Sequence, residues 1–367
     1  MRFELDDDLI ALRDLVERVF AENAGTERVR EVELHEGGFD RRLWHILADA
    51  GALGVALPEP VGGAGLGMLG LVTLLEQQGR RVAPVPLWAV LSLAALPLSQ
   101  FGSPRQVARW LPGLIAGETV VTGAFDTPPV ELTAGRLSGE LVSVPAAAVA
   151  AAVVCPVRRE SGELAVAVVP TDRAGVRVTP VAVTSRESYA AVSLDGVEVA
   201  EEDLLPGDGE EITRWVRQRA RLALAAVQLG VCEEALAMTA AYTSQREQFG
   251  RPLSANQGVA MRAADAYLDT ESIRLTVQYA AWLTDTGQDE RAARAALVAK
   301  WWASRGGLRT VHATQHLHGG IGADIEYPIH RYFLWGRQIA FTLGGADAVA
   351  AELGDLLRTG ATIGAPE

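Results

Sequence analysis

The sequence predicts an α+β protein in which a helical domain, a small antiparallel β-domain and a helical bundle follow one another. Three observations predict this order. Apolar residues recur at helical spacing over 1–118, short Val- and Ala-rich runs fill 119–208, and long amphipathic stretches return over 209–367. A chain of 367 residues is also longer than one hydrophobic core usually serves, so several domains are expected.

The first domain is predicted to be helical throughout. The stretch LIALRDLVERVFAEN follows an Asp cluster that can cap a helix, and it places an apolar stripe from Leu9 to Phe20. Further on, GSPRQVARWLPGLIAGE begins with the capping residue Ser103 and continues with Pro104, which suits a first helical position. This helix is expected to end near Gly117.

The middle segment reads as strands joined by turns. Runs such as AAAVVCPV, ELAVAVVP and GVRVTPV are separated by turn clusters such as RRESGE and TDRAG, which is typical of an antiparallel β-domain. The stretch LLPGDGEE, residues 204–211, is expected to link this domain to the next. The later stretches 221–242, 257–283 and 289–319 predict the long helices of a C-terminal helical bundle.

Composition excludes several classes of function. The net charge of −13 argues against binding to nucleic acid, which needs a basic face. The two cysteines, Cys155 and Cys232, stand in apolar surroundings without metal-ligand spacing and are expected to be buried and reduced. The N-terminus is acidic where a signal peptide is basic, and the longest apolar run, 86–98, is too short to span a bilayer. A cytoplasmic protein without a membrane span is therefore expected.

One glycine pattern is predicted to be a loop. GLGMLG, residues 65–70, matches the dinucleotide fingerprint G-x-G-x-x-G, but that fingerprint must follow a strand and needs an acidic residue about 20 positions later. Here the surrounding region is helical and residues 84–87 read PVPL. The glycines are therefore expected to lead into a helix and to bind no dinucleotide.

Two segments of the last domain carry residues suited to a phosphate-containing ligand. QREQFGRPL supplies Arg246, which can bind a pyrophosphate through two hydrogen bonds, and Phe249, which can pack on an adenine; Gln257 follows. The same residues also fit an ordinary helix end with a cation and a glycine cap.

The second segment is HATQHLHGGIGADIEYP. Gly319 and Gly320 would let the backbone approach a ligand closely, and His316 lies just before them. Three histidines within seven residues also raise the alternative of a metal site, but no Asp, Glu or Cys lies within the cluster. A glycine-rich helix end is the remaining alternative for this segment.

Taken together, these motifs resemble the acyl-CoA dehydrogenase family over essentially the whole chain. The resemblance is carried by LPEPVGGAGLG and GSPRQVARWLPGLIAGE in the first domain, and by REQFGRPLSANQ and HGGIGADIEYPIHRYF in the last. It implies that the last domain is a C-terminal four-helix bundle and that the protein is a tetramer that binds FAD. In this tetramer a carboxylate removes the α-proton of a CoA thioester and the flavin accepts the β-hydride. It also implies that the bundle of one subunit holds the adenine end of a flavin whose ring lies in the neighbouring subunit.

Carried over residue by residue, the resemblance gives a cofactor-binding set that we call the adenine-end arm. In it, Arg246 would meet the pyrophosphate, Phe249 would pack near the adenosine and Gln257 would hydrogen-bond in the same region. His316 stands where the family often has Gln. The set comprises Arg246, Phe249, Gln257, His316, Gly319 and Gly320.

The departures from the family pattern concern the chemistry. The family's commonest base is a Glu before a Gly, and counting along RYFLWGRQIAFTLGG places Leu343 there. A second family location for the base falls on Ala220, within one residue, in RQRARLALAA. An alkyl side chain cannot accept a proton, so no catalytic residue is expected in this chain. The family's aromatic residue near the flavin ring is also missing, because GELVSVPAAA stands in its place and 126–188 hold no Trp, Tyr or Phe.

These facts predict the non-catalytic subunit of a heteromeric, α2β2 acyl-CoA dehydrogenase of the actinobacterial steroid-degrading kind. A homologous partner subunit would supply the Glu and the flavin ring site, the substrate would be a bulky acyl-CoA, and an electron-transfer flavoprotein would accept the electrons. Two alternatives stay open. One is a self-sufficient homotetramer with a displaced base such as Asp347 or Glu326, and the other is a scaffold that has lost flavin chemistry. Asp347 is otherwise expected to cap the last helix.

Overall fold

The computed structural model describes residues 4–248 and 250–359, and within it the chain divides into two compact units. The β-containing unit holds residues 6–74 and 83–220, and the helical unit holds residues 4–5, 75–82 and the described chain from 221 onward. The chain passes between the units before α1, inside α4 (Gly67–Arg81), just after α4, and inside α8 (Gly209–Gln245). The domain boundaries expected from the sequence, 1–118, 119–208 and 209–367, remain a prediction.

Helices occupy the first part of the β-containing unit, as expected. Besides the beginning of α4, they are α1 (Asp7–Asn23), α2 (Thr26–His35), α3 (Arg41–Asp49), α5 (Leu87–Val90), a π-helical turn at Leu91–Ala95, α6 (Leu96–Phe101) and α7 (Pro104–Ile115). The cap of α1 is Asp6, whose side chain accepts from the Leu9 amide at 3.0 Å. Ser103 and Gln106 form a reciprocal capping box at the start of α7, with Pro104 in the first position.

A seven-stranded sheet follows. Its strands are β1 (Val121–Gly123), β2 (Val130–Thr133), β3 (Arg136–Pro145), β4 (Ala152–Arg159), β5 (Leu164–Pro170), β6 (Val176–Val181) and β7 (Tyr189–Glu198). The order β1-β4-β2-β3-β7-β6, with β5 on β4, corrects the purely antiparallel arrangement expected from the sequence. Pairing is antiparallel for β2–β3, β3–β7, β4–β5 and β6–β7, but β4 runs parallel to β1 and β2. The chain leaves β2 through β3 before it returns as β4, so these neighbours are not joined by a hairpin.

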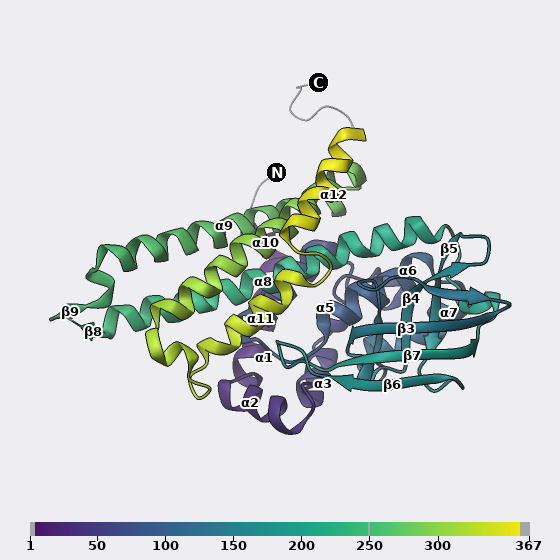
Figure 1. The fold of residues 1–367 in the computed structure, drawn as a ribbon, viewed down its shortest axis with the longest axis horizontal. Coiled ribbons are helices and arrows are strands. Elements are labelled where there is room, and N and C mark those ends of the chain that lie inside the picture. Colours follow the sequence, from purple (N-terminus) through teal and green to yellow (C-terminus); the bar gives the residue numbers. More distant parts are fainter. Residues whose placement is uncertain (1–3, 249, 360–367) are drawn as a thin grey trace. The chain divides into compact units, whose positions relative to one another are not determined.

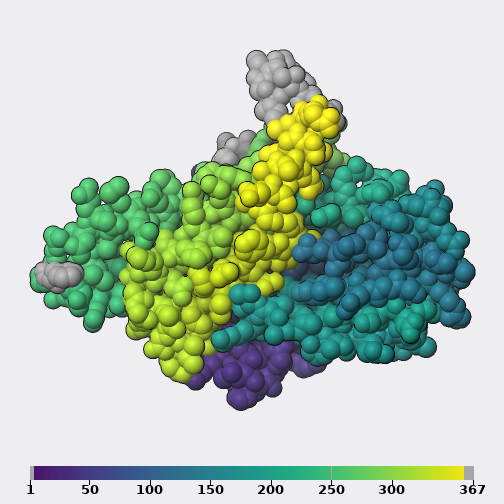
Figure 2. Space-filling view, viewed as in Figure 1, coloured from purple at the N-terminus to yellow at the C-terminus, as the bar shows by residue number. Residues whose placement is uncertain are grey.

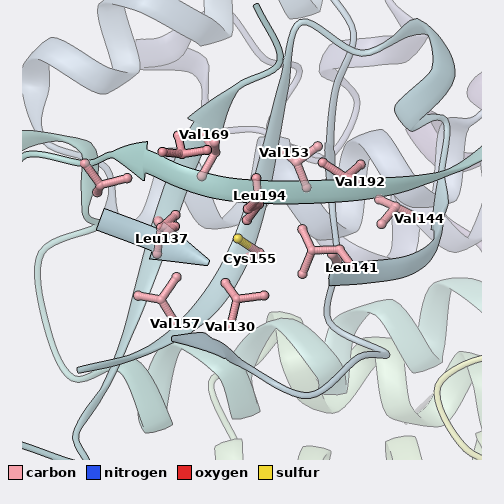
Figure 3. Packing of buried hydrophobic residues seen from close by; sticks show 14 of the residues in the cluster. Val130, Leu137, Leu141, Val144, Val153, Cys155, Val157, Val169, Val192 and Leu194 are labelled. Carbon is pink, nitrogen blue, oxygen red and sulfur yellow. The ribbon is translucent and has the colours of Figure 1, made fainter. Parts of the chain in front are cut away.

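Apolar side chains from the strands form the core of this unit. Figure 3 shows Val130, Leu137 and Leu141 pointing toward residues of β4 and β7, with Cys155 at the centre. Both cysteines are buried and free, as expected. Burial raises the pKa of the Cys155 thiol to about 12, so this thiol is an inert part of the core.

The helical unit contains the three long helices that the sequence predicts, which are the C-terminal part of α8, α9 (Gln257–Asp285) and α10 (Asp289–Leu317). Two shorter helices follow, α11 (Ile329–Phe341), which the sequence reading did not predict, and the expected last helix α12 (Ala346–Thr359). A hairpin of β8 (Glu247–Gln248) and β9 (Arg251–Pro252) joins α8 to α9, and α9 runs beside α10 (Figure 1). Asp347 lies in the first turn of α12 and is not its cap, because the helix begins one residue earlier.

Two glycines let α4 and α8 touch through their backbones. A Cβ at Gly79 would lie 2.0 Å from the Val227 carbonyl oxygen, and one at Gly230 would lie 1.9 Å from the Glu76 carbonyl oxygen. Neither contact leaves room for a side chain. The last turns of α4 are therefore fixed against α8 by a reciprocal pair of glycines.

Among the described residues, one helix meets the length and composition of a membrane span. It is α8, but 72% of its apolar window is buried inside the protein, as is usual for the core helix of a folded domain. Gly65 and Gly67 precede or begin α4 after a 3₁₀ turn at Glu59–Val61, with no strand before them in the described chain. The GLGMLG pattern therefore lies where a loop meets a helix, and residues 67–70 already form the first turn of α4.

Candidate functional site

The hairpin at the end of α8 positions the first half of the adenine-end arm. Arg246 follows the last residue of α8, and its carbonyl accepts from the Leu253 amide at 2.9 Å, which closes the hairpin. The Arg251 guanidinium donates to the Asn256 side-chain oxygen at 2.7 Å, just before α9 begins at Gln257. Arg246 and Gln257 are both exposed at this turn. Phe249, the third expected residue here, lies outside the described residues.

The second half of the arm lies where α10 ends. His316 is exposed in the last turn of α10, and the 3₁₀ turn η7 (Gly319–Ala323) follows at once. Gly319 has a φ of +64°, which favours glycine, and a Cβ added to Gly319 or Gly320 would meet nothing within 4 Å. The space beside both glycines is therefore open, as a bound ligand would require.

An aromatic cluster connects the two halves of the arm. The His318 ring stacks on the Tyr242 ring of α8 with centroids 4.7 Å apart, and Tyr327 packs against both. His318 Nδ1 donates to the Thr314 carbonyl at 2.8 Å, while Nε2 has no hydrogen-bond partner within the described chain. Burial lowers the pKa of His318, so the ring is held neutral.

Sequence reasoning did not assign this role to His318. The only sequence signal was its place in the histidine run, which also raised a metal site. Within the described residues no group of His, Cys, Asp and Glu is arranged to hold a metal ion. The structure instead uses His318 to pack the end of α10 against the end of α8.

In the helical unit, the backbone of Leu343, one of the two expected positions of the catalytic base, is bound by an arginine. Arg221, the residue after Ala220, donates from Nε to the Leu343 carbonyl oxygen at 3.0 Å, although 122 positions separate them. The same guanidinium binds both carboxylate oxygens of Glu352, at 2.8 and 2.7 Å. Leu343 is buried, and its φ is +58°.

Leu343 and the Arg221–Glu352 ion pair lie at the position where the family pattern has a catalytic base. The Leu343 side chain cannot accept a proton, and the nearby Glu352 carboxylate is engaged by Arg221. The displaced candidates are poorly placed for catalysis, because Asp347 is exposed in α12 and Glu326 is exposed in the turn before α11. Neither lies in an enclosed environment of the kind that tunes a general base.

The segments expected beside a flavin ring are buried in the β-containing unit. Thr122 donates from its hydroxyl to the Pro145 carbonyl at 2.6 Å, and Ala124, Ala146 and Ala147 are all 3% exposed or less. The Ala146 amide in turn donates to the Ser188 carbonyl at 2.7 Å. These alanine side chains are small and already packed, so they offer no aromatic face for a ring to stack on.

Comparisons with known proteins identify the family of the chain. The family described as acyl-CoA dehydrogenase, N-terminal domain, matches residues 6–118, and acyl-CoA dehydrogenase, C-terminal domain, matches residues 207–354. Acyl-CoA dehydrogenase FadE27 of Mycobacterium tuberculosis is 36% identical over 94% of this chain and 95% of its own.

Solved structures of two-protein complexes are also similar. The steroid acyl-CoA dehydrogenase Tcur3481-Tcur3483 includes a chain 43% identical to this one, with a TM-score of 0.89 over 96% of this chain and 98% of that one. The ChsE4-ChsE5 complex of Mycobacterium tuberculosis matches at 36% identity and a TM-score of 0.93, over 99% and 100% of the two chains. A glutaryl-CoA dehydrogenase of Mycobacterium smegmatis in complex with FADH2 shares the fold at 20% identity and a TM-score of 0.86, over 98% of this chain and 96% of that one. The chain belongs to the acyl-CoA dehydrogenase family.

Proposed function

We propose that this chain is the non-catalytic subunit of a heteromeric, FAD-dependent acyl-CoA dehydrogenase. The observation that carries the proposal is the contrast between the two sites of the helical unit. Arg246, Gln257 and the Gly319–Gly320 backbone are exposed and open to a ligand, whereas Leu343 is buried at the base position beside the Arg221–Glu352 ion pair.

In this assembly the chain binds one end of a cofactor whose reactive ring lies in the partner. Arg246 would bind the pyrophosphate of FAD, Gln257 and His316 would lie along the adenosine, and Phe249 would complete the contact. When bound, FAD accepts the hydride from the β-carbon of the CoA thioester. The carboxylate that removes the α-proton would come from a homologous partner subunit in an α2β2 tetramer.

The substrate class follows from the relatives. One similar structure is a steroid acyl-CoA dehydrogenase, and two are complexes of two different proteins, which favours a bulky steroid acyl-CoA and a heteromeric assembly here. We extend the proposal to a cytoplasmic location and to an electron-transfer flavoprotein as acceptor. A self-sufficient homotetramer is less well supported, because Asp347 and Glu326 are both exposed.

Co-expression tests this proposal. The chain would be produced alone and together with a homologue from the same genome that carries Glu at the position of Leu343 or Ala220. We expect colourless, poorly soluble protein alone, and a yellow complex with one FAD for each pair of chains together. A yellow, active homotetramer formed by this chain alone would refute the proposal.

An arginine variant tests the arm within that complex. Arg246→Ala should lower flavin occupancy, measured from the flavin absorbance per protein, although the substitution lies in the chain without the base. Arg358→Ala is the matched control, because Arg358 is exposed on α12, away from the arm. Equal flavin occupancy in both variants would contradict the role of Arg246.

A further inference from the structure

Three aromatic rings from separate parts of the helical unit meet between the two halves of the adenine-end arm. Tyr242 belongs to the last turns of α8, His318 follows the last residue of α10, and Tyr327 lies in the turn after η7. The His318 ring centroid is 4.7 Å from that of Tyr242 and 5.3 Å from that of Tyr327. These are spacings of favourable aromatic contacts, so the three rings hold separate backbone segments together.

Two of these rings are joined directly to arm residues. The Arg246 amide donates to the Tyr242 carbonyl at 2.8 Å, so Arg246 lies one helical turn beyond Tyr242. On the other side, His318 immediately precedes Gly319 and Gly320. The stack of His318 on Tyr242 therefore links the backbone that carries Arg246 to the backbone of the glycine pair.

The glycine pair depends on its neighbours for a fixed position. Both glycines are exposed, and a Cβ added to either would meet nothing within 4 Å. Glycine loses more conformational freedom on becoming ordered than any other residue, so an open glycine pair needs support from outside. On one side, the Gln315 side chain donates to the Gly322 carbonyl at 3.0 Å, which ties the loop to its own helix α10. On the other side, His318 ties the loop to α8, the helix that leads to Arg246.

The His318 ring is buried in a state that offers a second proton no acceptor. It is 2% exposed, and its Nδ1 donates to the Thr314 carbonyl at 2.8 Å. A carbonyl oxygen only accepts, so the proton of the neutral ring is on Nδ1, while Nε2 has no hydrogen-bond partner within the described chain. Burial lowers the pKa of His318, and the bond to Thr314 opposes this in part. The titratable side chains packed against the ring are Tyr242 and Tyr327, and neither supplies a carboxylate to balance a positive charge.

We propose that His318 is a positioning residue for cofactor binding, whose ring fixes the Gly319–Gly320 backbone relative to Arg246. The inference depends on the proposed function, from which it takes the binding of FAD by the arm. It adds to that function a buried residue that acts through its neighbours, whereas Arg246 and Gln257 are exposed. The ring must be neutral in this role, since a protonated ring would be a buried cation without a counter-charge.

The first test removes a ring from the co-expressed complex. After the flavin is stripped from each purified variant, FAD would be titrated back, and its dissociation constant would be measured from the flavin fluorescence. Tyr242→Ala should raise this constant at least about fivefold, whereas Tyr242→Phe, which keeps the ring, should stay within about twofold of the wild type. Tyr279→Ala is the matched control and should also stay within about twofold. Tyr279 is a half-buried tyrosine that stacks on Trp282, toward the end of α9 that is far from Gln257.

Variants of His318 itself test whether the two rings act together. His318→Ala should also raise the dissociation constant for FAD at least about fivefold. The double variant Tyr242→Ala/His318→Ala should be no more than about twofold worse than either single variant, because each substitution removes the same stack. A double variant whose two losses multiply would show that the residues act independently, and this would overturn the proposal.

The pH profile separates positioning by a neutral ring from simple packing. The pKa of His318 is lowered from its ordinary value of 6.5, so the contribution of the neutral ring is complete above that pH and is lost as the pH falls below it. The wild-type dissociation constant for FAD should therefore rise as the pH falls from about 6.5 to about 5, and His318→Phe, which cannot be protonated, should flatten this rise. His312 and His316 remain in both proteins, so the difference between the two profiles belongs to His318. Parallel profiles would contradict the proposal.

Hydrogen exchange gives a readout without the cofactor. In flavin-free complexes, peptides covering 319–324 should exchange faster in Tyr242→Ala and His318→Ala than in the wild type, and at the wild-type rate in Tyr279→Ala. Peptides covering 295–305, in the middle of α10, should be unchanged in all variants. Equal acceleration in both regions would mean that the substitutions weaken the whole helical unit, and the proposal would fail.

The outcomes separate this inference from the proposed function. If Arg246→Ala lowers flavin occupancy while Tyr242→Ala and His318→Ala bind FAD as tightly as the wild type, the inference fails and the proposed function stands. If Arg246→Ala leaves flavin occupancy unchanged, the arm does not bind the cofactor, and the proposed function and this inference both fail.

Discussion

Replacing Glu352 with Ala should destabilise the helical unit more than replacing Arg221 with Met. The two residues form a bidentate ion pair, but they differ in exposure: the Arg221 side chain is 5% exposed and the Glu352 side chain 48%. Losing Glu352 leaves a buried guanidinium without its carboxylate. Losing Arg221 leaves a carboxylate that water already reaches, together with a Leu343 carbonyl that loses one donor.

The expected magnitudes follow from this asymmetry. Breaking a fully buried ion pair costs about 3–5 kcal/mol, and the partial exposure of Glu352 lowers this to about 2–4 kcal/mol for Glu352→Ala. For Arg221→Met the cost is about 1–2 kcal/mol, because methionine fills most of the space, water can solvate the released Glu352 carboxylate, and the Leu343 carbonyl loses one donor. Glu352→Gln should lie between the two, since the amide keeps one acceptor for the guanidinium.

The assay is urea unfolding of the purified protein, with the free energy of unfolding obtained by linear extrapolation. Hydrogen exchange in peptides covering 338–348 gives the local readout near Leu343, and α12 is accessible at the surface (Figure 2). A larger loss of stability for Arg221→Met than for Glu352→Ala would refute the reasoning, because it would mean that the buried cation is not what the carboxylate stabilises.

Three further predictions concern other positions. Burial raises the pKa of Glu187 from 4.5 to about 7, so the stability that its protonated form contributes is present below pH 4.5 and is lost as the pH rises to about 7. In urea unfolding at several pH values, Glu187→Gln should flatten this fall in the free energy of unfolding. An unchanged pH profile would contradict the burial of the carboxyl group. Gly320→Ala should lower flavin occupancy without loss of stability. Gly319→Ala should lower flavin occupancy too, and should also cost about 1 kcal/mol in urea unfolding because of its positive φ. Equal free energies of unfolding for the two variants would show that the backbone at Gly319 relaxes freely. Lys300 is fully buried and donates hydrogen bonds to Ser304 and to a carbonyl at the end of α11. Lys300→Met should therefore lower the free energy of unfolding by about 1–2 kcal/mol. An unchanged free energy of unfolding would show that these hydrogen bonds make no net contribution to stability.

Local sequence signals predicted the elements of the fold well. Capping residues act by short-range hydrogen bonds, so Ser103 marked the start of α7 correctly. The Asp cluster marked the start of α1 approximately, because the helix begins inside the cluster at Asp7 and is capped by Asp6. The parallel pairing of β4 with β1 and β2 was missed, because it joins strands that are distant along the chain and leaves no local signature. The π-helical turn at 91–95 lies within an apolar run whose composition gives no sign of it.

The sequence predicted those residues of the candidate site that match the family's motifs. Residue types located Arg246, Gln257 and the glycine pair, and the structure places them at two neighbouring helix ends. Counting along the chain also identified Leu343 as a position without a base. It could not show that Arg221 reaches the Leu343 carbonyl or that His318 stacks on Tyr242, since both contacts depend on how separate helices pack.

The glycine pair between α4 and α8 has a consequence for any mutational library of this protein. Gly79 and Gly230 each face a backbone carbonyl of the other helix at a distance that admits no side chain. Both already have the smallest side chain that exists, so a substitution at one position cannot be rescued by a smaller residue at the other. In a saturation library selected for assembly with the partner, these two positions should therefore return only glycine, singly and in combination.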